Sequence, residues 1–283
     1  MLAIGVHPMN LHLRLAQLWP GTFPGIDVDF VTYPEGRDTG KLIASGQFAV
    51  GGTGSTPPLI SQADGLAVIY LAASAPRPAN GALLVAAESP IAKPADLKGR
   101  RVALIDGSFH TFLLARSLEQ AGLSLADVER CEMSPAVARA ALMKGEVDVW
   151  IAMAPMIDQA LASGEARLLS LCGSTIPNRS VFWTLEGAAT EDELEAFVAG
   201  LVALGRAISA DAERAVELLA GKGSGAEAKA AWKGVVTGRD WTVMPARASL
   251  VAEQQEEADV LYAHGEFAAP LKIEAFRSAV GAA

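Results

Sequence analysis

The segment Asp106–Thr111 carries residue types that suit anion binding, because it combines a glycine, two hydroxyls and a histidine at the predicted start of a helix. Backbone N–H groups at a helix N-terminus lack intrahelical partners and attract negative charge. We therefore predict an oxyanion-binding loop, with contacts from Ser108, from the N–H groups that follow it, and from Thr111 or His110. An ordinary helix cap, which Ser or Asp also supplies, is the alternative interpretation.

A similar loop, Gly51–Pro58, also leads from a predicted strand to a predicted helix. It offers flexible glycines and three hydroxyls, which suit ligand binding at a second wall of the same site. It is not a nucleotide-binding loop, because it lacks the Lys-Ser/Thr ending of the P-loop and the glycine spacing of the dinucleotide fingerprint. A sharp turn that needs glycine is the alternative. Two such loops, one in each half of the chain, favour a ligand held between two walls.

Further residues are candidates for the same site. Asn10 follows the first predicted strand, and it either caps the next helix or faces the ligand. Arg77 and Arg179 lie where the chain is predicted to cross between two lobes, and either could neutralise an anion by bidentate hydrogen bonding. Each arginine is equally consistent with an exposed surface charge.

No catalytic, cofactor-binding or metal-binding residue is predicted. His7 and His12 are five positions apart, which does not place them on one helix face as metal ligands. The sequence has no Gly-x-Ser-x-Gly nucleophile elbow. Its two cysteines, Cys131 and Cys172, have no metal-ligand spacing, and we expect buried free thiols in separate strands.

The composition is that of a globular protein with a full core, since 51% of the 283 residues are hydrophobic and 19% are charged. A net charge of −9 disfavours nucleic acid or an anionic membrane as partner, although the local field of a pocket can still attract a small anion. No apolar run approaches the roughly 18 residues of a membrane span.

The elements that must position these loops alternate between strands and helices. In the first half we expect strands at 2–6, 26–33, 49–52 and 66–72, with helices at 11–18, 36–45 and 57–64. The pattern then restarts, with strands at 81–87, 101–105, 128–133, 147–152 and 167–172 and helices at 94–97, 111–121, 135–144 and 156–163. Helices at 191–209, 211–220, 226–236 and 246–263 follow. This order predicts an α/β fold with two mostly parallel sheets.

The chain is predicted to cross between two lobes near 73–81 and again near 176–183. Two crossings make a two-segment hinge with a ligand cleft between the lobes. We expect a first, discontinuous lobe of residues 1–78 plus 182–283, which contains the C-terminal helices, and a second lobe of residues 79–181.

Several short stretches, taken together in their order and spacing, carry a family resemblance. They are Thr53–Pro58, Glu88–Ile91 with Ala95–Gly99, Gly107-Ser108, Ser134–Ala136 with Ala138–Ala141, Gly145–Trp150, and Glu253–Gln255 with Ala258-Asp259. Over almost its whole length the sequence resembles the periplasmic solute-binding proteins of sulfonate, taurine and nitrate importers, most closely the aliphatic-sulfonate group.

The resemblance implies a class II periplasmic-binding-protein fold, hinge closure on a small organic anion, and delivery to an ABC permease in the inner membrane. It implies ligand contacts in the same three loops, namely Pro8, Met9 and Asn10, then Thr53, Gly54 and Ser55, and then Gly107, Ser108, Phe109 and His110. One departure concerns Met153–Met156, where family members often carry an aromatic and acidic cluster. Met153 is therefore a further candidate contact, and a bulkier or more apolar ligand is permitted.

The resemblance leaves other functions open. A same-fold protein could bind a heteroaromatic vitamin precursor through stacking. A same-fold cytosolic desulfinase would need a cysteine in the first cleft loop, where this chain has Pro8 and Met9. We predict a monomeric binding protein without enzymatic activity. Because Met1 opens directly into a predicted strand, we expect a periplasmic protein whose signal peptide has been removed, or a cytoplasmic one if Met1 is the natural start.

Overall fold

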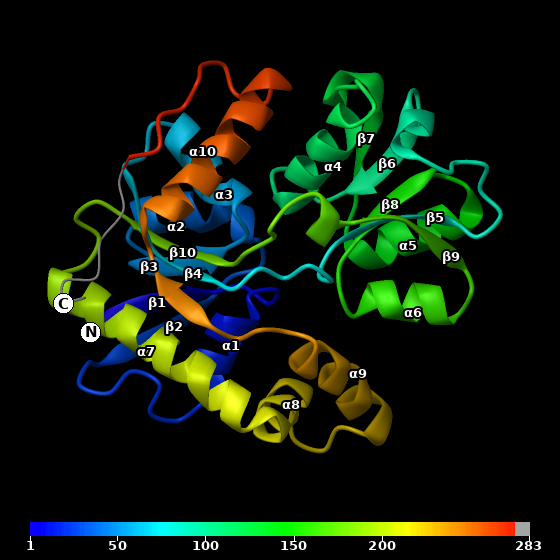
Figure 1. The fold of residues 1–283 in the computed structure, drawn as a ribbon. Helices are drawn as coiled ribbons and strands as arrows, with labels where there is room; N and C mark the ends of the chain where they lie inside the picture. The colour runs from blue at the N-terminus through cyan, green and yellow to red at the C-terminus, as the bar shows by residue number, and fades with distance from the viewer. Residues whose placement is uncertain (275–283) are drawn as a thin grey trace. The chain divides into compact units, whose positions relative to one another are not determined.

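The computed structural model describes residues 1–274, and the chain divides into two compact units. The first unit comprises residues 1–75, residues 179–258 and the chain from Ala269, and the second comprises residues 76–178 and 259–268, as labelled by element in Figure 1. This division differs from the predicted lobe boundaries chiefly at 259–268, which the sequence analysis assigned to the first lobe.

The first unit is built on a six-stranded sheet. In spatial order its strands are β11 (Val243–Pro245), β4 (Val68–Ser74), β10 (Val181–Leu185), β3 (Val50–Thr53), β1 (Leu2–Val6) and β2 (Val28–Thr32). Strands β1 to β4 run in one direction, whereas β10 and β11 run against their neighbours.

The second unit is built on a five-stranded sheet. Its strands, in spatial order, are β7 (Glu129–Glu132), β6 (Arg101–Leu104), β8 (Val149–Ala152), β5 (Ala82–Ala86) and β9 (Ala166–Leu171). Here β5 is antiparallel to both of its neighbours, and the other pairs are parallel.

The prediction of mostly parallel sheets is therefore wrong for β5, β10 and β11. The positions of the chain crossings explain why β5 and β10 are antiparallel. The chain leaves the first unit at the carboxyl end of β4 and returns near Arg179, so the returning strand β10 must begin at that same end. Likewise β5 begins where β9 ends, because both lie next to a crossing. The sequence analysis read 176–183 as a crossing and missed β10, whose five residues are all buried.

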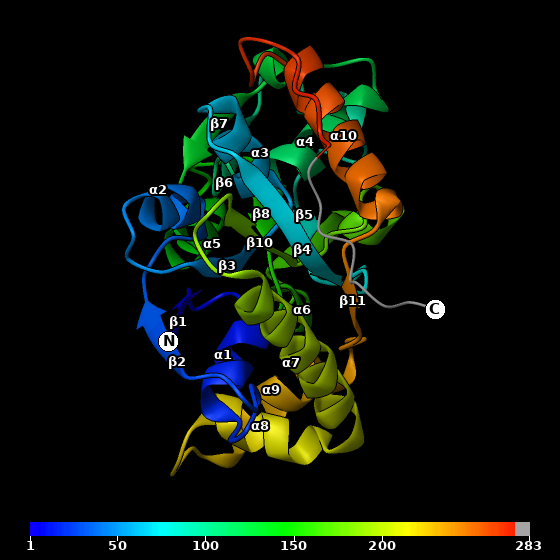
Figure 2. The same cartoon turned by 90° about the vertical axis from the view of Figure 1, so that its left-hand side faces the viewer.

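Helices cover the sheet of the first unit. They are α1 (Leu11–Leu18), the short η1 (Gly36–Asp38), α2 (Thr39–Ala44), α3 (Thr56–Ala63), α7 (Glu191–Ala210), α8 (Ala212–Ala220), α9 (Ala226–Thr237) and α10 (Ala248–Ala263), which continues into the second unit. In both Figure 1 and Figure 2, α8 and α9 lie beside α1, and α8 packs on α1, α7 and α9. The core includes the fully buried Trp183, Phe182, Tyr70, Phe48 and Phe197.

The helices of the second unit are shorter. They are η2 (Pro94–Leu97), α4 (Phe109–Glu119), η3 (Leu125–Asp127), α5 (Pro135–Lys144), α6 (Met156–Ala162) and η4 (Cys172–Ser174). Its core packs Trp150, Leu84 and Ile157 together with alanines of α5 and α6. Both cysteines are free, but only Cys172 is buried, whereas Cys131 on β7 is half-buried. Within residues 1–274, no helix is long and apolar enough to cross a membrane.

Candidate functional site

The predicted ligand loops of the first unit share one edge of its sheet. Strands β1 and β3 end there and lead into residues 7–10 and 53–55. In β10, Val181 pairs with Thr53 and with Ala73, so the chain reaches this edge from Arg179. We call this the first carboxyl edge, since ligands of open α/β sheets bind outside the carboxyl ends of the strands.

Asn10 caps α1 at this edge through its side-chain oxygen, and the cap does not use its Nδ2 donor. Its Oδ1 accepts a hydrogen bond from Leu13 N at 3.1 Å, which places its Nδ2 on the other side of the amide. The Asn10 side chain packs directly on β3, because a Cβ on Gly52 would approach Nδ2 to 2.6 Å. Asn10 is 2% exposed, and its Nδ2 has no hydrogen-bond partner among the residues that the structure describes. A buried donor without a partner costs about 1–3 kcal/mol, so this N–H is suited to a ligand oxygen.

The hydroxyls of the neighbouring 53–55 loop form hydrogen bonds with other groups of the protein. Thr53 Oγ1 donates to Gly54 O at 2.8 Å and accepts from Trp183 Nε1 at 3.0 Å. The hydroxyls of Ser55 and Thr56 hydrogen-bond to the buried carboxyl of Glu257 on α10. Donors to a ligand must therefore come from the backbone N–H groups of this loop, and Pro57 and Pro58 supply none.

The loop between β6 and α4 forms the corresponding edge of the second unit. Gly107 has φ of 69°, in the left-handed region that favours glycine. Ser108 caps α4, since its Oγ accepts from His110 N at 3.2 Å and donates to Ile105 O at 2.6 Å. The ordinary-cap interpretation is therefore confirmed for the Ser108 side chain, and ligand contacts of residues 107–109 stay a prediction. Phe109 is buried and packs edge-on against the His110 ring.

His110 is the second buried donor of the chain's predicted site. Its Nδ1 accepts a hydrogen bond from Ile105 N at 3.1 Å, so this nitrogen carries no proton. Burial lowers the pKa of His110 to about 3, which keeps the ring neutral at physiological pH with its proton on Nε2. This Nε2–H is buried and has no hydrogen-bond partner within residues 1–274.

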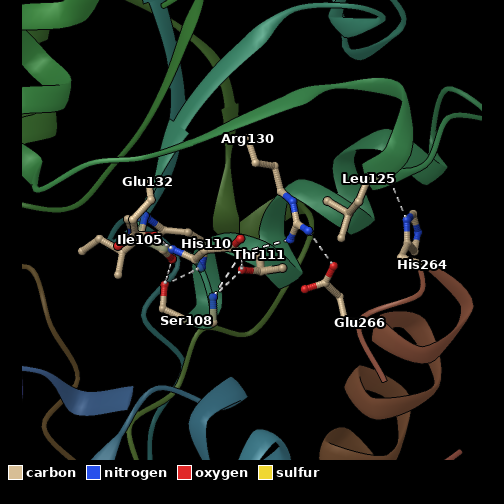
Figure 3. A network of polar contacts seen from close by, with 11 residues as sticks. Ile105, Ser108, His110, Thr111, Leu125, Arg130, Glu132, His264 and Glu266 are labelled. Carbon is tan, nitrogen blue, oxygen red and sulfur yellow. Dashed lines mark hydrogen bonds and ion pairs between the residues drawn. The ribbon is translucent and has the colours of Figure 1, made fainter. Parts of the chain in front are cut away.

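A polar network holds the His110 loop in shape, as Figure 3 shows. Asp106 Oδ1 accepts from Gly107 N at 3.1 Å, from Thr111 Oγ1 at 2.7 Å and from Arg130 Nη1 at 3.0 Å. Arg130 also forms a 3.0 Å ion pair with Glu266, which belongs to the C-terminal segment of the second unit. The loop is therefore restrained by contacts within the protein, and a restrained loop loses less entropy when it binds a ligand.

The remaining predicted residues have other surroundings. Arg77 is buried, and its Nε and Nη2 donate to the backbone and side-chain oxygens of Asn178, both at 2.9 Å. Arg179 forms a bidentate ion pair with Glu253 at 2.7 and 3.0 Å and also donates to Ser74 O. Both arginines thus brace the crossing segments, and a ligand role for either is a prediction.

Three apolar candidates complete the set. Pro8 is exposed, Met9 is 47% exposed, and Met153 is half-buried in the loop after β8. These side chains offer apolar contact but no hydrogen-bond donor. Among the described residues, no group of three or more His, Cys, Asp or Glu side chains could hold a metal ion.

Comparison with known proteins identifies the family. Residues 23–173 match the family described as NMT1/THI5 like. A protein of Escherichia coli (strain K12), named for binding aliphatic sulfonates, is 32% identical over 268 residues, which are 92% of this chain and 83% of that protein. The chain belongs to the NMT1/THI5-like family.

Solved structures of family relatives have the same fold. The periplasmic aliphatic sulphonate binding protein of Escherichia coli gives a TM-score of 0.81 at 31% identity, over 96% of this chain and 90% of that one. The alkanesulfonate-binding protein of Xanthomonas axonopodis pv. citri, bound to MOPS, gives 0.83 at 28% identity over 96% of both chains. The predicted two-lobe binding-protein fold is confirmed. A desulfurization enzyme, at 20% identity and a TM-score of 0.63, shares the fold alone.

Two residues that the sequence analysis did not select stand out in this family member. Glu257 lies behind the 53–55 loop, although 201 positions separate it from Thr56. Arg239 precedes β11, whose first residue Val243 pairs with Ser74 at the first carboxyl edge. Burial lowers the pKa of Arg239 only to about 10, so its guanidinium, which lies 5.9 Å from the centre of the Trp241 ring, keeps its positive charge at neutral pH. Sequence spacing contains no signal for either placement.

Proposed function

We propose that the chain is the solute-binding subunit of an ABC importer and captures a small organic anion with a sulfonate-like head group. The observation that carries this proposal is the pair of buried N–H donors, Asn10 Nδ2 and His110 Nε2, one at the carboxyl edge of each sheet. Both are neutral and lack partners among the described residues. Neutral donors suit a weakly basic sulfonate oxygen, which accepts hydrogen bonds without taking a proton.

The relatives support both the ligand class and its size. The binding proteins reported above are named for aliphatic sulfonates or alkanesulfonates, and one of them is bound to MOPS, which carries a ring. Met153, in the loop after β8, and Met9, in the loop after β1, are flexible apolar side chains. We therefore propose a sulfonate whose organic tail is larger than that of taurine, because methionine adapts to irregular apolar surfaces.

The proposal includes a periplasmic location, a monomeric state, and a permease in the inner membrane as partner. One relative is named as periplasmic, which supports the location. We further propose that the chain has no enzymatic activity. The desulfinase alternative needs a cysteine in the first ligand loops, whereas the first cysteine of this chain is Cys131 on β7.

Calorimetry with a ligand panel tests the function. The panel comprises butanesulfonate, MOPS, taurine, sulfate, nitrate and a neutral pyrimidine. We expect the two larger sulfonates to bind at least about tenfold more tightly than taurine, a difference of about 1.4 kcal/mol. Saturable binding of the pyrimidine, with no heat from any sulfonate, would refute the proposed ligand class. Release of sulfite from any sulfonate or sulfinate would refute the absence of enzymatic activity.

A further inference from the structure

Glu257 is a buried acid in direct contact with the loop that we propose as a ligand contact. It lies on α10, is 2% exposed, and accepts a 2.5 Å hydrogen bond from Thr56 Oγ1 through its Oε1. The Ser55 hydroxyl hydrogen-bonds to the same carboxyl. Ser55 and Thr56 are the cap and first residue of α3, so the acid lies immediately behind the start of this helix.

The groups that face Glu257 are neutral or already paired. Tyr70, from β4, interacts electrostatically with Glu257, and burial raises the pKa of Tyr70 so far that it stays neutral. Gln254, one turn earlier on α10, donates to Ser55 O at 2.9 Å and contacts the Tyr70 hydroxyl at 3.4 Å. Glu253, also on α10, is held in its ion pair with Arg179. With hydroxyls as its partners, burial raises the pKa of Glu257 to about 7.

Only a few atoms would separate an anion bound at this loop from the Glu257 carboxyl. Because Pro57 and Pro58 have no N–H, the backbone donors at the start of α3 are those of Gly54, Ser55 and Thr56. The side chains of the last two residues hold Glu257. A ligand that accepts these N–H groups therefore brings a second negative charge close to a poorly solvated carboxylate, and like charges at short range favour the protonated acid.

We propose that Glu257 is a positioning residue which couples anion binding at the 53–56 loop to the uptake of one proton. The inference rests on the proposed function. The proton comes from solvent and binds to the Glu257 carboxylate when the anion binds, and it returns to solvent when the anion leaves. No covalent bond changes. The protonated acid keeps its hydrogen bonds to the two hydroxyls and so holds the loop in its binding conformation without repelling the ligand.

A sulfonate suits the test, because its own charge is constant from about pH 5 to 9. Butanesulfonate would be titrated into the wild-type protein by calorimetry at several pH values in this range. We expect its affinity to fall about tenfold between about pH 6 and 9, the equivalent of a ligand-induced pKa shift of one unit. Near pH 7.5, titrations in two buffers with different ionisation enthalpies should show the uptake of about half a proton, the maximum for a shift of one unit.

Two matched variants separate this coupling from a merely structural role. Glu257→Gln mimics the protonated acid, and we expect it to bind butanesulfonate with an affinity that no longer changes with pH. Glu256→Gln removes an exposed acid from the next position of the same helix and should keep the wild-type pH profile. If Glu257→Gln does not fold, the two-buffer measurement on the wild-type protein still decides.

The outcomes are distinct. Butanesulfonate binding with a flat pH profile and no proton uptake in the wild-type protein would overturn the role of Glu257 and leave the proposed function standing. The same pH dependence in the Glu257→Gln variant would also overturn it. No sulfonate binding at any pH would overturn the proposed function, and this inference with it.

Discussion

The imidazole Nδ1 of His110 accepts a hydrogen bond from the backbone N–H of Ile105, and this 3.1 Å contact decides which ring nitrogen carries the proton. The residues lie at opposite ends of the loop that joins β6 to α4. The bond fixes the ring orientation and leaves Nε2–H as a buried donor. The same contact therefore shapes the loop and prepares its donor.

Substitutions that mimic one or the other nitrogen of His110 test this donor. Asn at position 110 can place its carbonyl oxygen near the Nδ1 position and accept from Ile105 N, but it has no group at the Nε2 position. Gln can place an amide N–H near Nε2. We expect His110→Asn to weaken butanesulfonate binding at least about tenfold, or 1.4 kcal/mol, and His110→Gln to weaken it less. Calorimetry of both variants against the wild-type protein is the measurement, and equal affinities of the two variants would contradict the assignment.

Asn10 provides a similar test in the first unit. Asn10→Asp keeps an oxygen that accepts from Leu13 N, so α1 retains its cap, but its second oxygen is a buried charge without a partner, and we expect the free energy of unfolding to fall by several kcal/mol. The substitution replaces the Nδ2 donor with a carboxylate oxygen, which repels an anion. We expect binding of butanesulfonate to weaken at least about a hundredfold, or about 2.7 kcal/mol.

Asn10→Ala is the control, since it removes both the cap and the donor. It should lower the free energy of unfolding by about 1 kcal/mol and weaken binding less than Asn10→Asp does, because it adds no repulsion. Urea unfolding and calorimetry measure the two effects separately. Wild-type affinity in Asn10→Asp would show that Nδ2 does not face the ligand.

Much of this fold was predictable from local sequence patterns. The bounds of α1 and α5 match their predictions. Gly122, Gly145 and Gly164 follow three of the predicted helices and have a positive φ, the conformation in which glycine commonly ends a helix. The direction of β5 and β10 was not predictable in this way. It depends on where the chain re-enters each sheet, which is a property of the tertiary structure.

In the candidate site too, local features were predictable from the sequence and tertiary contacts were not. The loops at Asn10 and His110 were predicted from strand-to-helix transitions that contain polar residues. Sequence could not show that the Ser55 and Ser108 hydroxyls are used inside the protein, because their partners are set by the folded backbone. Glu257 was missed because its contact with Thr56 joins distant parts of the chain.

His110 also affects stability in acid. Its pKa is about 3 in the folded protein and near 6.5 when unfolded, so the unfolded state binds more protons between these values. The stabilisation is complete above about pH 6.5 and is lost as pH falls toward 3, by about 1.4 kcal/mol per pH unit. We expect His110→Gln, which does not titrate, to remove this contribution in urea unfolding measured from pH 3.5 to 6.5. An unchanged acid slope would contradict a buried neutral imidazole.

The contribution of Glu257 to the free energy of unfolding changes with pH in the opposite direction to that of His110. Its pKa is raised from 4.5 to about 7 on folding, so the folded state binds more protons between these values. The stabilisation is complete below about pH 4.5 and is lost as pH rises to 7, about 3 kcal/mol in all. Above pH 7 we expect Glu257→Gln to be more stable than the wild-type protein by an amount of this order.

The opposing contributions of His110 and Glu257 overlap between about pH 4.5 and 6.5, where each amounts to about 1.4 kcal/mol per pH unit and the two cancel. The wild-type protein should therefore show little slope from these two groups in this window. A variant that lacks one group should show the pH dependence of the other group alone. The free energy of unfolding should therefore rise with pH in Glu257→Gln and fall with pH in His110→Gln. Urea unfolding of the three proteins at pH 4.5, 5.5 and 6.5 measures these slopes. Parallel profiles for the two variants would show that at least one of the buried groups does not titrate as its surroundings predict.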